Sequence, residues 1–246
     1  MSAPAADVRG PASLGSLMPK ALTPRSGGSR RSRPAQRSDL PRDVMDELQR
    51  VTKPTQLRDA VSRLSRAVEL LDRGDSGAAV AEATKAKQLS SRSGTVREVL
   101  GLALYGQGRW QDALTELKAY RRFSGRADQN HVIADCLRAL GKPQDAVPLA
   151  EEELRSKVPN EAKAEAVVVA ASALADQGRF AEALAFLGRA KTREGVSEPY
   201  TLRLWYVRGD ILAKAGRTDE AAAEFRKVMR HDPSAFDVAE RLADLG

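Results

Sequence analysis

LRLWYVRGDILAKAGRTDEAAAEFRKVMRHDPSA, residues 202 to 235, is the stretch that decides the fold of this chain. Its spacing predicts two helices joined by a tight turn at Gly216, because glycine adopts the backbone dihedrals of a helix end at little cost. Pro233 stops the second helix. Each helix carries one stripe of core residues at helical spacing. A single helix cannot bury such a stripe by itself, so the two helices must pack against each other and against a further neighbour. The stripes are Trp205, Gly209 and Leu212, then Ala221, Phe225 and Val228.

The turn glycine and its surroundings occur five times along the chain. Consecutive copies are separated by 34, 33, 37 and 38 residues. Four of the five have a basic residue after the glycine and an acid before the alanine, which makes a chance match hard to sustain. A period of this length predicts an array of helical repeats. The copies are GDSGAA from Gly74, GRWQDA from Gly108, GKPQDA from Gly141, GRFAEA from Gly178 and GRTDEA from Gly216.

This pattern resembles the tetratricopeptide repeat, whose period is about 34 residues and whose Trp, Gly, Ala, Phe and Pro positions match residues 202–235. The chain departs from that family at Arg208, where the family usually has Leu. The resemblance covers roughly Ala60 to Ala235 and implies an all-α fold, a right-handed α-solenoid of five helix pairs with capping helices. The repeats are expected at about 55–93, 94–126, 127–160, 164–197 and 202–235.

Short helices are expected at both ends of the array. Residues 38–54 predict one that covers the first repeat, with Ser38 or Asp39 as its cap and Pro41 at its first position; a motif that docks a partner is the alternative. Residues 236–246, capped by Ser234, predict the closing helix that a last repeat requires.

Two local features of the third repeat stand out. Pro148 predicts a distorted or late-starting second helix, since proline is disfavoured beyond the first turn. The acidic run EEEL at 151–154 is interpreted as a solvated face.

Residues 1–37 predict a disordered basic tail. They contain five prolines, four glycines and no aromatic residue, too little apolar surface to offset the entropy of ordering. Residues 1–42 hold eight basic and two acidic residues, and so +6 of the chain's net charge of +7. The tail is interpreted as an arm for RNA, DNA or an acidic protein, or else as a solubilising tail or a wrongly assigned start. Its arginines are Arg25, Arg30, Arg31, Arg33 and Arg37.

Composition excludes several classes of protein. The single cysteine, Cys136, rules out an internal disulfide and a multi-cysteine zinc site, and is predicted to be a small buried residue rather than a reactive thiol. The start has no continuous apolar core of a signal peptide, and no run approaches the roughly 18 apolar residues of a membrane span. We therefore expect a cytoplasmic protein without membrane contact; its abundance of Arg and Ala favours a bacterial origin.

No motif for catalysis is visible in the sequence. His131 and His231 are the only histidines and belong to different repeats, so no cluster has metal-ligand spacing. Phosphate loops, dinucleotide-binding GxGxxG and the nucleophile motif GxSxG are missing as well. We expect no enzymatic activity, no cofactor and no metal.

The resemblance implies a binding site instead. In tetratricopeptide proteins the first helix of each repeat lines a concave groove that holds a partner protein. The paired Asn needed to clamp the carboxylate of heat-shock chaperones are missing here. Mapped onto repeats two to five, the groove positions are Glu98, Tyr105, Asp128, His131, Asp135, Arg138, Glu165, Ser172, Asp176, Arg203, Tyr206, Asp210 and Lys214.

Two functions follow from these features. The first is a non-enzymatic adaptor whose groove binds a peptide or helix of a protein partner. The alternative is an RNA- or ribosome-associated factor that contacts phosphates through the tail. The adaptor is favoured because the ordered part carries only +1 and the tail has no aromatic residue to stack a base. The mapped positions are mildly acidic, so a basic ligand is expected, including the chain's own segment Ser29–Arg37. The partner's identity and the oligomeric state stay open.

Overall fold

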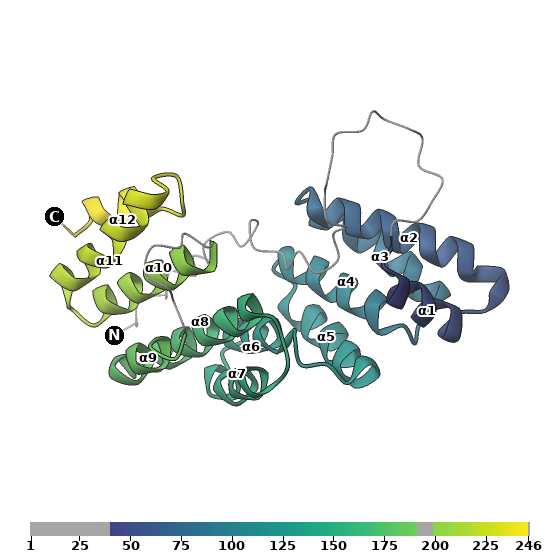
Figure 1. Cartoon of the computed structure of the whole chain (residues 1–246), viewed down its shortest axis with the longest axis horizontal. Helices are drawn as coiled ribbons and strands as arrows, with labels where there is room; N and C mark the ends of the chain where they lie inside the picture. Colours follow the sequence, from purple (N-terminus) through teal and green to yellow (C-terminus); the bar gives the residue numbers. More distant parts are fainter. Residues whose placement is uncertain (1–39, 191–198, 246) are drawn as a thin grey trace, which may run out of the picture. The chain divides into compact units, whose positions relative to one another are not determined.

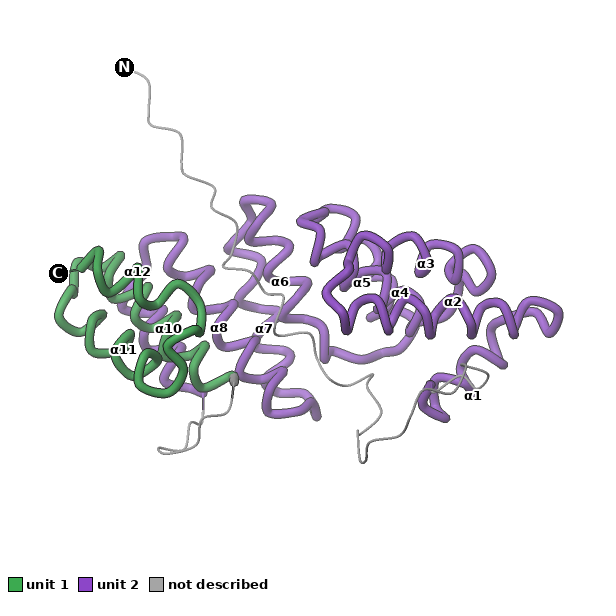
Figure 2. Tube along the Cα trace, turned by 90° about the horizontal axis from the view of Figure 1, so that it is seen from above, with its two compact units in different colours: residues 1–18, 192–246 green, residues 19–191 purple. Residues whose placement is uncertain are grey.

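The computed structural model describes residues 40–190 and 199–245, which form two compact units divided after Lys191. Figure 2 colours them separately. The described residues of the first, the N-terminal unit, are 40–190, and those of the second, the C-terminal unit, are 199–245. The predicted tail of residues 1–37 lies outside the described residues.

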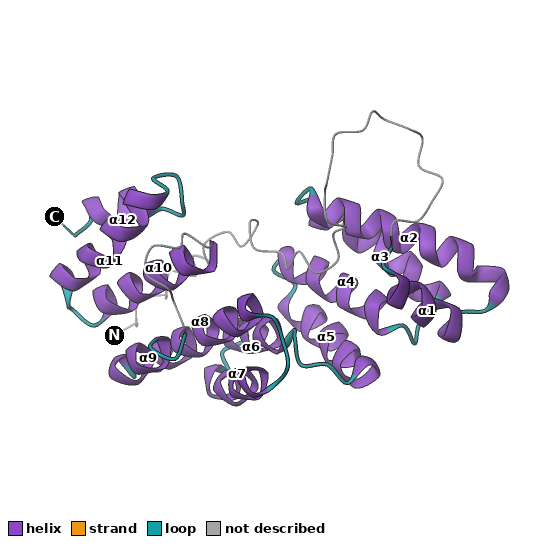
Figure 3. Cartoon of the chain, viewed as in Figure 1, coloured by secondary structure: helices purple, strands orange, loops and turns teal. Residues whose placement is uncertain are grey.

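Both units are helical, and no strand occurs in the described ranges (Figure 3). The all-α prediction is therefore confirmed. The C-terminal unit holds α10 (Pro199–Lys214), α11 (Thr218–His231) and α12 (Val238–Ala243). The N-terminal unit (Figure 1) holds α1 (Arg42–Val51), α2 (Pro54–Asp72), α3 (Ser76–Leu89), α4 (Gly94–Gly106), α5 (Trp110–Ser124), α6 (Asn130–Ala139), the 3-10 turn η2 (Pro143–Asp145), α7 (Ala146–Arg155), α8 (Asn160–Asp176) and α9 (Phe180–Leu187).

The five predicted turn glycines close the helix pairs in one way. Each has a positive φ between 70° and 77°, a region in which residues with a side chain are strained. The residue that follows each glycine donates its N–H to the carbonyl five residues earlier, as Arg109 does to Leu104 at 3.0 Å and Arg217 to Leu212 at 2.9 Å. This is the Schellman end of an α-helix, and it turns the chain into the second helix of the pair.

The two helices of a pair approach closely where the first carries a small residue. In the C-terminal unit, a Cβ placed on Gly209 of α10 would stand 2.7 Å from the Phe225 ring of α11. Phe225 is fully buried. Ala221, one helical turn earlier, is also fully buried, so the stripe quoted from the sequence forms the α10–α11 interface.

The third repeat departs from the others as Pro148 predicted. Elsewhere the second helix begins two residues after the turn glycine, for example at Trp110 after Gly108. After Gly141 the chain forms η2 first, and α7 begins only at Ala146. This places Pro148 in the first turn of α7, where its missing N–H removes no helical hydrogen bond. The prediction of a late start is confirmed.

The two end helices are shorter than the sequence suggested. Helix α1 begins at Arg42 and buries Val44 and Leu48. Helix α12 begins at Val238, so Ser234 does not cap it: the Ser234 N–H and hydroxyl both bond to Asp232. Phe236, predicted to be helical, has a φ of 56° and packs its ring 4.6 Å from that of Tyr206. Because this φ lies outside the right-handed helical region, the helix starts only after Phe236.

Candidate functional site

The first helices of successive repeats contact one another in the N-terminal unit. Helix α2 contacts α4, α4 contacts α6, and α6 contacts α8. Polar side chains cross from helix to helix along one face of α4, of α6 with the loop before it, and of α8. We call this surface the first-helix face. Nine of the predicted site residues belong to it: Glu98, Tyr105, Asp128, His131, Asp135, Arg138, Glu165, Ser172 and Asp176.

One group of these residues surrounds the N-terminal end of α6. The Gln129 side-chain amide donates to Glu98 Oε1 of α4 at 2.8 Å, and the Tyr120 hydroxyl of α5 donates to Asp128 Oδ1 at 2.6 Å. Arg126 forms an ion pair with Asp128. Burial raises the pKa of Glu98 to about 7, because the hydrogen bond from Gln129 offsets only part of its desolvation.

His131 and Glu153 form a buried pair beside this group. The backbone N–H of His131 donates to Glu153 Oε2 at 2.6 Å, and the His131 Nδ1 lies 2.8 Å from Oε1 of the same carboxylate. Glu153 thereby caps α6, which has no capping side chain of its own. Burial lowers the pKa of His131, but the hydrogen bond and charge of Glu153 outweigh burial, and the pKa is raised overall. Glu165 and Asp128 also face this histidine.

A second group lies toward the C-terminal ends of the same helices. Asp135 of α6 accepts from the Tyr105 hydroxyl of α4 at 2.5 Å and from Arg138 Nε at 3.1 Å. Arg138 also lies 3.5 Å from Asp176 of α8 and so links repeats three and four. Ser172 is half-buried on α8. The first-helix face is thus polar across three repeats.

Three residues mapped to the groove surface are instead buried. Glu98 is 8% exposed, His131 8% and Asp135 6%. Gln129 before α6 bonds to Glu98, Glu153 of α7 bonds to His131, and Tyr105 of α4 bonds to Asp135. Glu98 and Asp135 therefore join neighbouring repeats, and His131 joins the two helices of the third repeat.

The other four mapped residues belong to the C-terminal unit and lie on α10. Arg203 is half-buried on α10. The Tyr206 hydroxyl donates to Asp237 at 2.5 Å, and Asp210 pairs with Lys214 and with Arg241 of α12. The polar groups of Tyr206 and Asp210 are therefore bonded to α12 and to Asp237, the residue just before it. The tail arginines lie outside the described residues.

Sequence reasoning missed several residues that bond to members of the first-helix face. The acidic run 151–154 was interpreted as solvated, which is wrong for Glu153, whose exposure is 0%. A signal was present: Ala146, Ala150 and Glu153 share one stripe at i, i+4 and i+7, and both alanines are fully buried. Tyr120, Arg126 and Gln129 gave no comparable signal, because their roles depend on how α4 and α5 pack against the start of α6.

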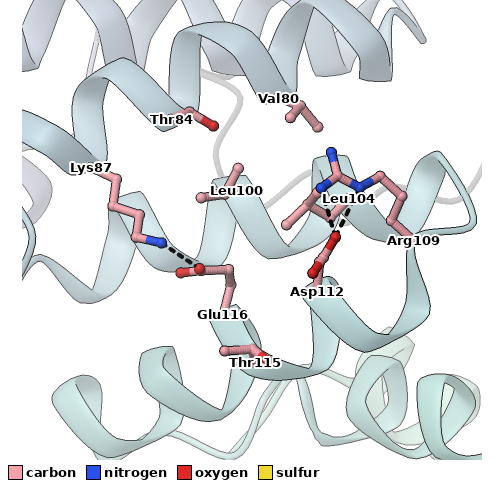
Figure 4. Close-up of a pocket in the computed structure, with 9 residues that line it drawn as sticks. All are labelled: Val80, Thr84, Lys87, Leu100, Leu104, Arg109, Asp112, Thr115 and Glu116. Carbon is pink, nitrogen blue, oxygen red and sulfur yellow. Dashed lines mark hydrogen bonds and ion pairs between the residues drawn. The ribbon is translucent and has the colours of Figure 1, made fainter.

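A separate hollow of about 240 Å³ lies among α3, α4 and α5 (Figure 4). Val80, Leu100 and Leu104 supply its apolar surface. Its rim carries two ion pairs, Lys87 with Glu116 and Arg109 with Asp112, so its charges are already matched. Helix α3 is rich in alanine, and its short side chains leave the space unfilled.

Membrane-spanning and metal-binding features are both missing from the described part of the chain. Among residues 40–190 and 199–245, no helix is long and apolar enough to cross a membrane. The same residues contain no group of three or more His, Cys, Asp or Glu placed to hold a metal ion.

Helix pairs closed by Schellman glycines, with a polar face shared by the first helices, define a helical-repeat protein of the scaffold class. Models of the tetratricopeptide repeat match residues 64–128, 132–196 and 202–245. The chain belongs to the tetratricopeptide repeat family. Members of this family are generally non-enzymatic scaffolds, and the fold supports a protein–protein interaction scaffold.

Solved structures with the same fold include TTC0263, a thermophilic TPR protein of Thermus thermophilus. It is 20% identical with a TM-score of 0.63, over 76% of this chain and 98% of that one. YrrB, described as a TPR protein with an unusual peptide-binding site, is 18% identical with a TM-score of 0.52, over 82% and 97%. A putative kinesin light chain of Podosopora anserina is 20% identical with a TM-score of 0.56, over 72% and 94%. None of the curated protein sequences compared with the chain matches it.

Proposed function

We propose that the first-helix face of α4, α6 and α8 binds an extended or helical segment of a partner protein. The observation that carries this proposal is the continuity of the face, because its side chains bridge repeats two, three and four without a break. Ligands of solenoids lie along such surfaces and contact several repeats at once. YrrB, a structural neighbour, is described as having a peptide-binding site.

The face retains polar groups that a segment can reach. Tyr105, Arg138 and Ser172 are half-buried, and the Asp176 side chain is 37% exposed. A segment bound here gains many weak contacts over a rigid surface, which favours specificity over high affinity. The chain then acts as an adaptor: the first-helix face holds one partner protein, and the remaining surface is left for other contacts.

Site-specific photocrosslinking tests this proposal. A p-benzoylphenylalanine at Ser172 is expected to capture a protein partner from native lysate, with or without RNase. The same group at Gln111, an exposed position on α5, is the matched control and is expected to capture much less. Equal capture at both positions would contradict a first-helix binding face. Loss of capture after RNase treatment would favour the alternative, an RNA-associated factor.

A further inference from the structure

The N-terminal end of α6 gathers oxygen atoms that lack donors. Gln129 uses its amide N–H on Glu98, and its own Oε1 has no hydrogen-bond partner although the residue is only 4% exposed. The adjacent Asn130, 1% exposed, donates to the Leu149 carbonyl, and its Oδ1 is also without a donor. Buried acceptors of this kind are costly to leave unsatisfied.

The charges around these oxygens are mostly negative. Glu98 of α4 faces Glu47 from α1, Asp128 from the start of repeat three, and the Tyr120 hydroxyl from α5. Arg126 is the cation that lowers the pKa of Glu98 and so opposes these negative charges. The Arg126 side chain is 58% exposed and pairs with Asp128 from the loop before α6. An exposed guanidinium of the chain itself therefore already pairs with this acidic group.

We infer that Glu98, Asp128 and the Gln129 side-chain carbonyl form a binding site for an arginine side chain of the partner, in competition with Arg126. This inference rests on the proposed function and names the chemistry of the segment. A guanidinium offers five N–H donors in a planar fork, enough to serve two carboxylates and a carbonyl together. An ammonium group is a single point charge and matches this arrangement less well.

Arginine binding at this site is coupled to the release of a proton. Burial raises the pKa of Glu98 to about 7, so a large fraction of this carboxyl is protonated at neutral pH. A guanidinium requires the ionised carboxylate, so it displaces the proton of Glu98 and the Arg126 side chain. If one such proton is released, affinity rises about ten-fold between pH 6 and pH 8 and levels off above that range.

Titration calorimetry with a tetra-arginine peptide tests the site on the full chain, with tetra-citrulline as the uncharged peptide of the same shape. The wild-type affinity for tetra-arginine is expected to rise about ten-fold from pH 6 to pH 8, and tetra-citrulline is expected not to bind. Glu98→Gln is expected to bind tetra-arginine more weakly and with little pH dependence. His131 faces Asp128 and also titrates, so persistence of the pH dependence in Glu98→Gln would overturn the inference. Glu182→Gln, an equal change of charge at an exposed position, is expected to behave like the wild type.

A second variant probes the competition and does not disturb a buried group. Arg126→Ala is expected to raise the affinity for tetra-arginine several-fold, whereas Arg155→Ala, at another exposed arginine, removes the same charge without that gain. Equal affinities of these two variants would overturn the inference. If crosslinking at Ser172 persists while tetra-arginine fails to distinguish the variants, the arginine site is wrong and the proposed function stands. If tetra-arginine distinguishes the variants but Ser172 captures no partner, the arginine site stands and the proposed function is wrong.

Discussion

Gly101 of α4 lies against Leu117 of α5 so closely that a Cβ on Gly101 would stand 2.7 Å from Leu117 Cγ and 3.3 Å from its backbone nitrogen. Leu117 is fully buried and cannot move aside into solvent. The same relationship joins Gly209 and Phe225 in the C-terminal unit. Close approach of the two helices therefore depends on the missing side chain at these positions.

Replacing Gly101 with Ala is expected to lower the free energy of unfolding by about 1–3 kcal/mol through overpacking. Gly94→Ala, at the start of the same helix, is the control. Its new methyl group would meet Ser124 and Tyr120 at 3.5–3.7 Å, ordinary contact distances, so it is expected to be neutral or mildly stabilising. Urea denaturation compares the two. Equal destabilisation would mean that the α4–α5 contact is not as close as described.

Removal of the Glu153 carboxylate is expected to destabilise the third repeat strongly. Glu153→Ala leaves the backbone N–H and the ring of His131 buried without their acceptor, at a cost of about 3 kcal/mol. Glu182→Ala breaks an exposed pair with Arg179 and is expected to cost less than about 1 kcal/mol. Hydrogen exchange of the His131 amide provides a local measurement, and unchanged protection in Glu153→Ala would contradict the capping role.

Glu98 makes the stability of the N-terminal unit depend on pH. Burial raises its pKa from 4.5 to about 7, so the folded chain binds a proton that the unfolded chain has released. Stability is therefore expected to fall as pH rises from about 4.5 to about 7. Glu98→Gln does not titrate, and at pH 8 it is expected to exceed the wild type by up to about 3 kcal/mol, with little difference near pH 4.5.

Chemical denaturation of both proteins across this range checks that expectation. Glu182→Gln serves as the control, because an exposed hydrogen bond with Arg179 lowers the pKa of Glu182 and places its titration below this window. Parallel stability curves for the wild type and Glu98→Gln would show that Glu98 ionises normally in the folded chain.

Cys136 is expected to be inert toward thiol reagents while the chain is folded. Its exposure is 0%, and burial raises the pKa of the thiol to about 12, so the reactive thiolate is scarce at pH 8. Labelling with dithionitrobenzoate should follow the rate of unfolding and become rapid in urea. Fast labelling of the native chain would show that α6 opens readily.

The fold was predictable because its signals are local. A glycine with positive φ and a buried alanine at the helix crossing recur in all five copies, and a large apolar residue follows one turn later in three of them, Leu117, Leu187 and Phe225. Each acts on residues within one helix pair. Pro148 was equally informative, since the constraint of proline applies to its own helix. The end helix was harder: Ser234 suggested a cap, but the ring of Phe236 packs on Tyr206, a contact 30 residues away that no local pattern reveals.

The position of the first-helix face was predictable from the sequence, but the hydrogen-bond partners of its residues were not. Helical spacing placed Glu98, His131 and Asp135 on first helices, but their burial depends on how closely the adjacent repeat packs. Gln129 and Glu153 gain their roles only when three helices meet at the start of α6. Such contacts between helices are set by packing geometry, which a single sequence does not encode in its spacing.

A hydrogen bond joins Tyr206 to Asp237, 31 residues later, and the two residues stand at the same distances from Gly216 as Glu98 and its partner Gln129 do from Gly108. Helix α12 therefore stands in the place that the first helix of a next repeat would take. The C-terminus of the array is an exchangeable end piece, and a duplicated helix pair inserted before Val238 would meet the same tyrosine. Duplication of a helix pair can therefore lengthen such an array without redesign of its terminal helix.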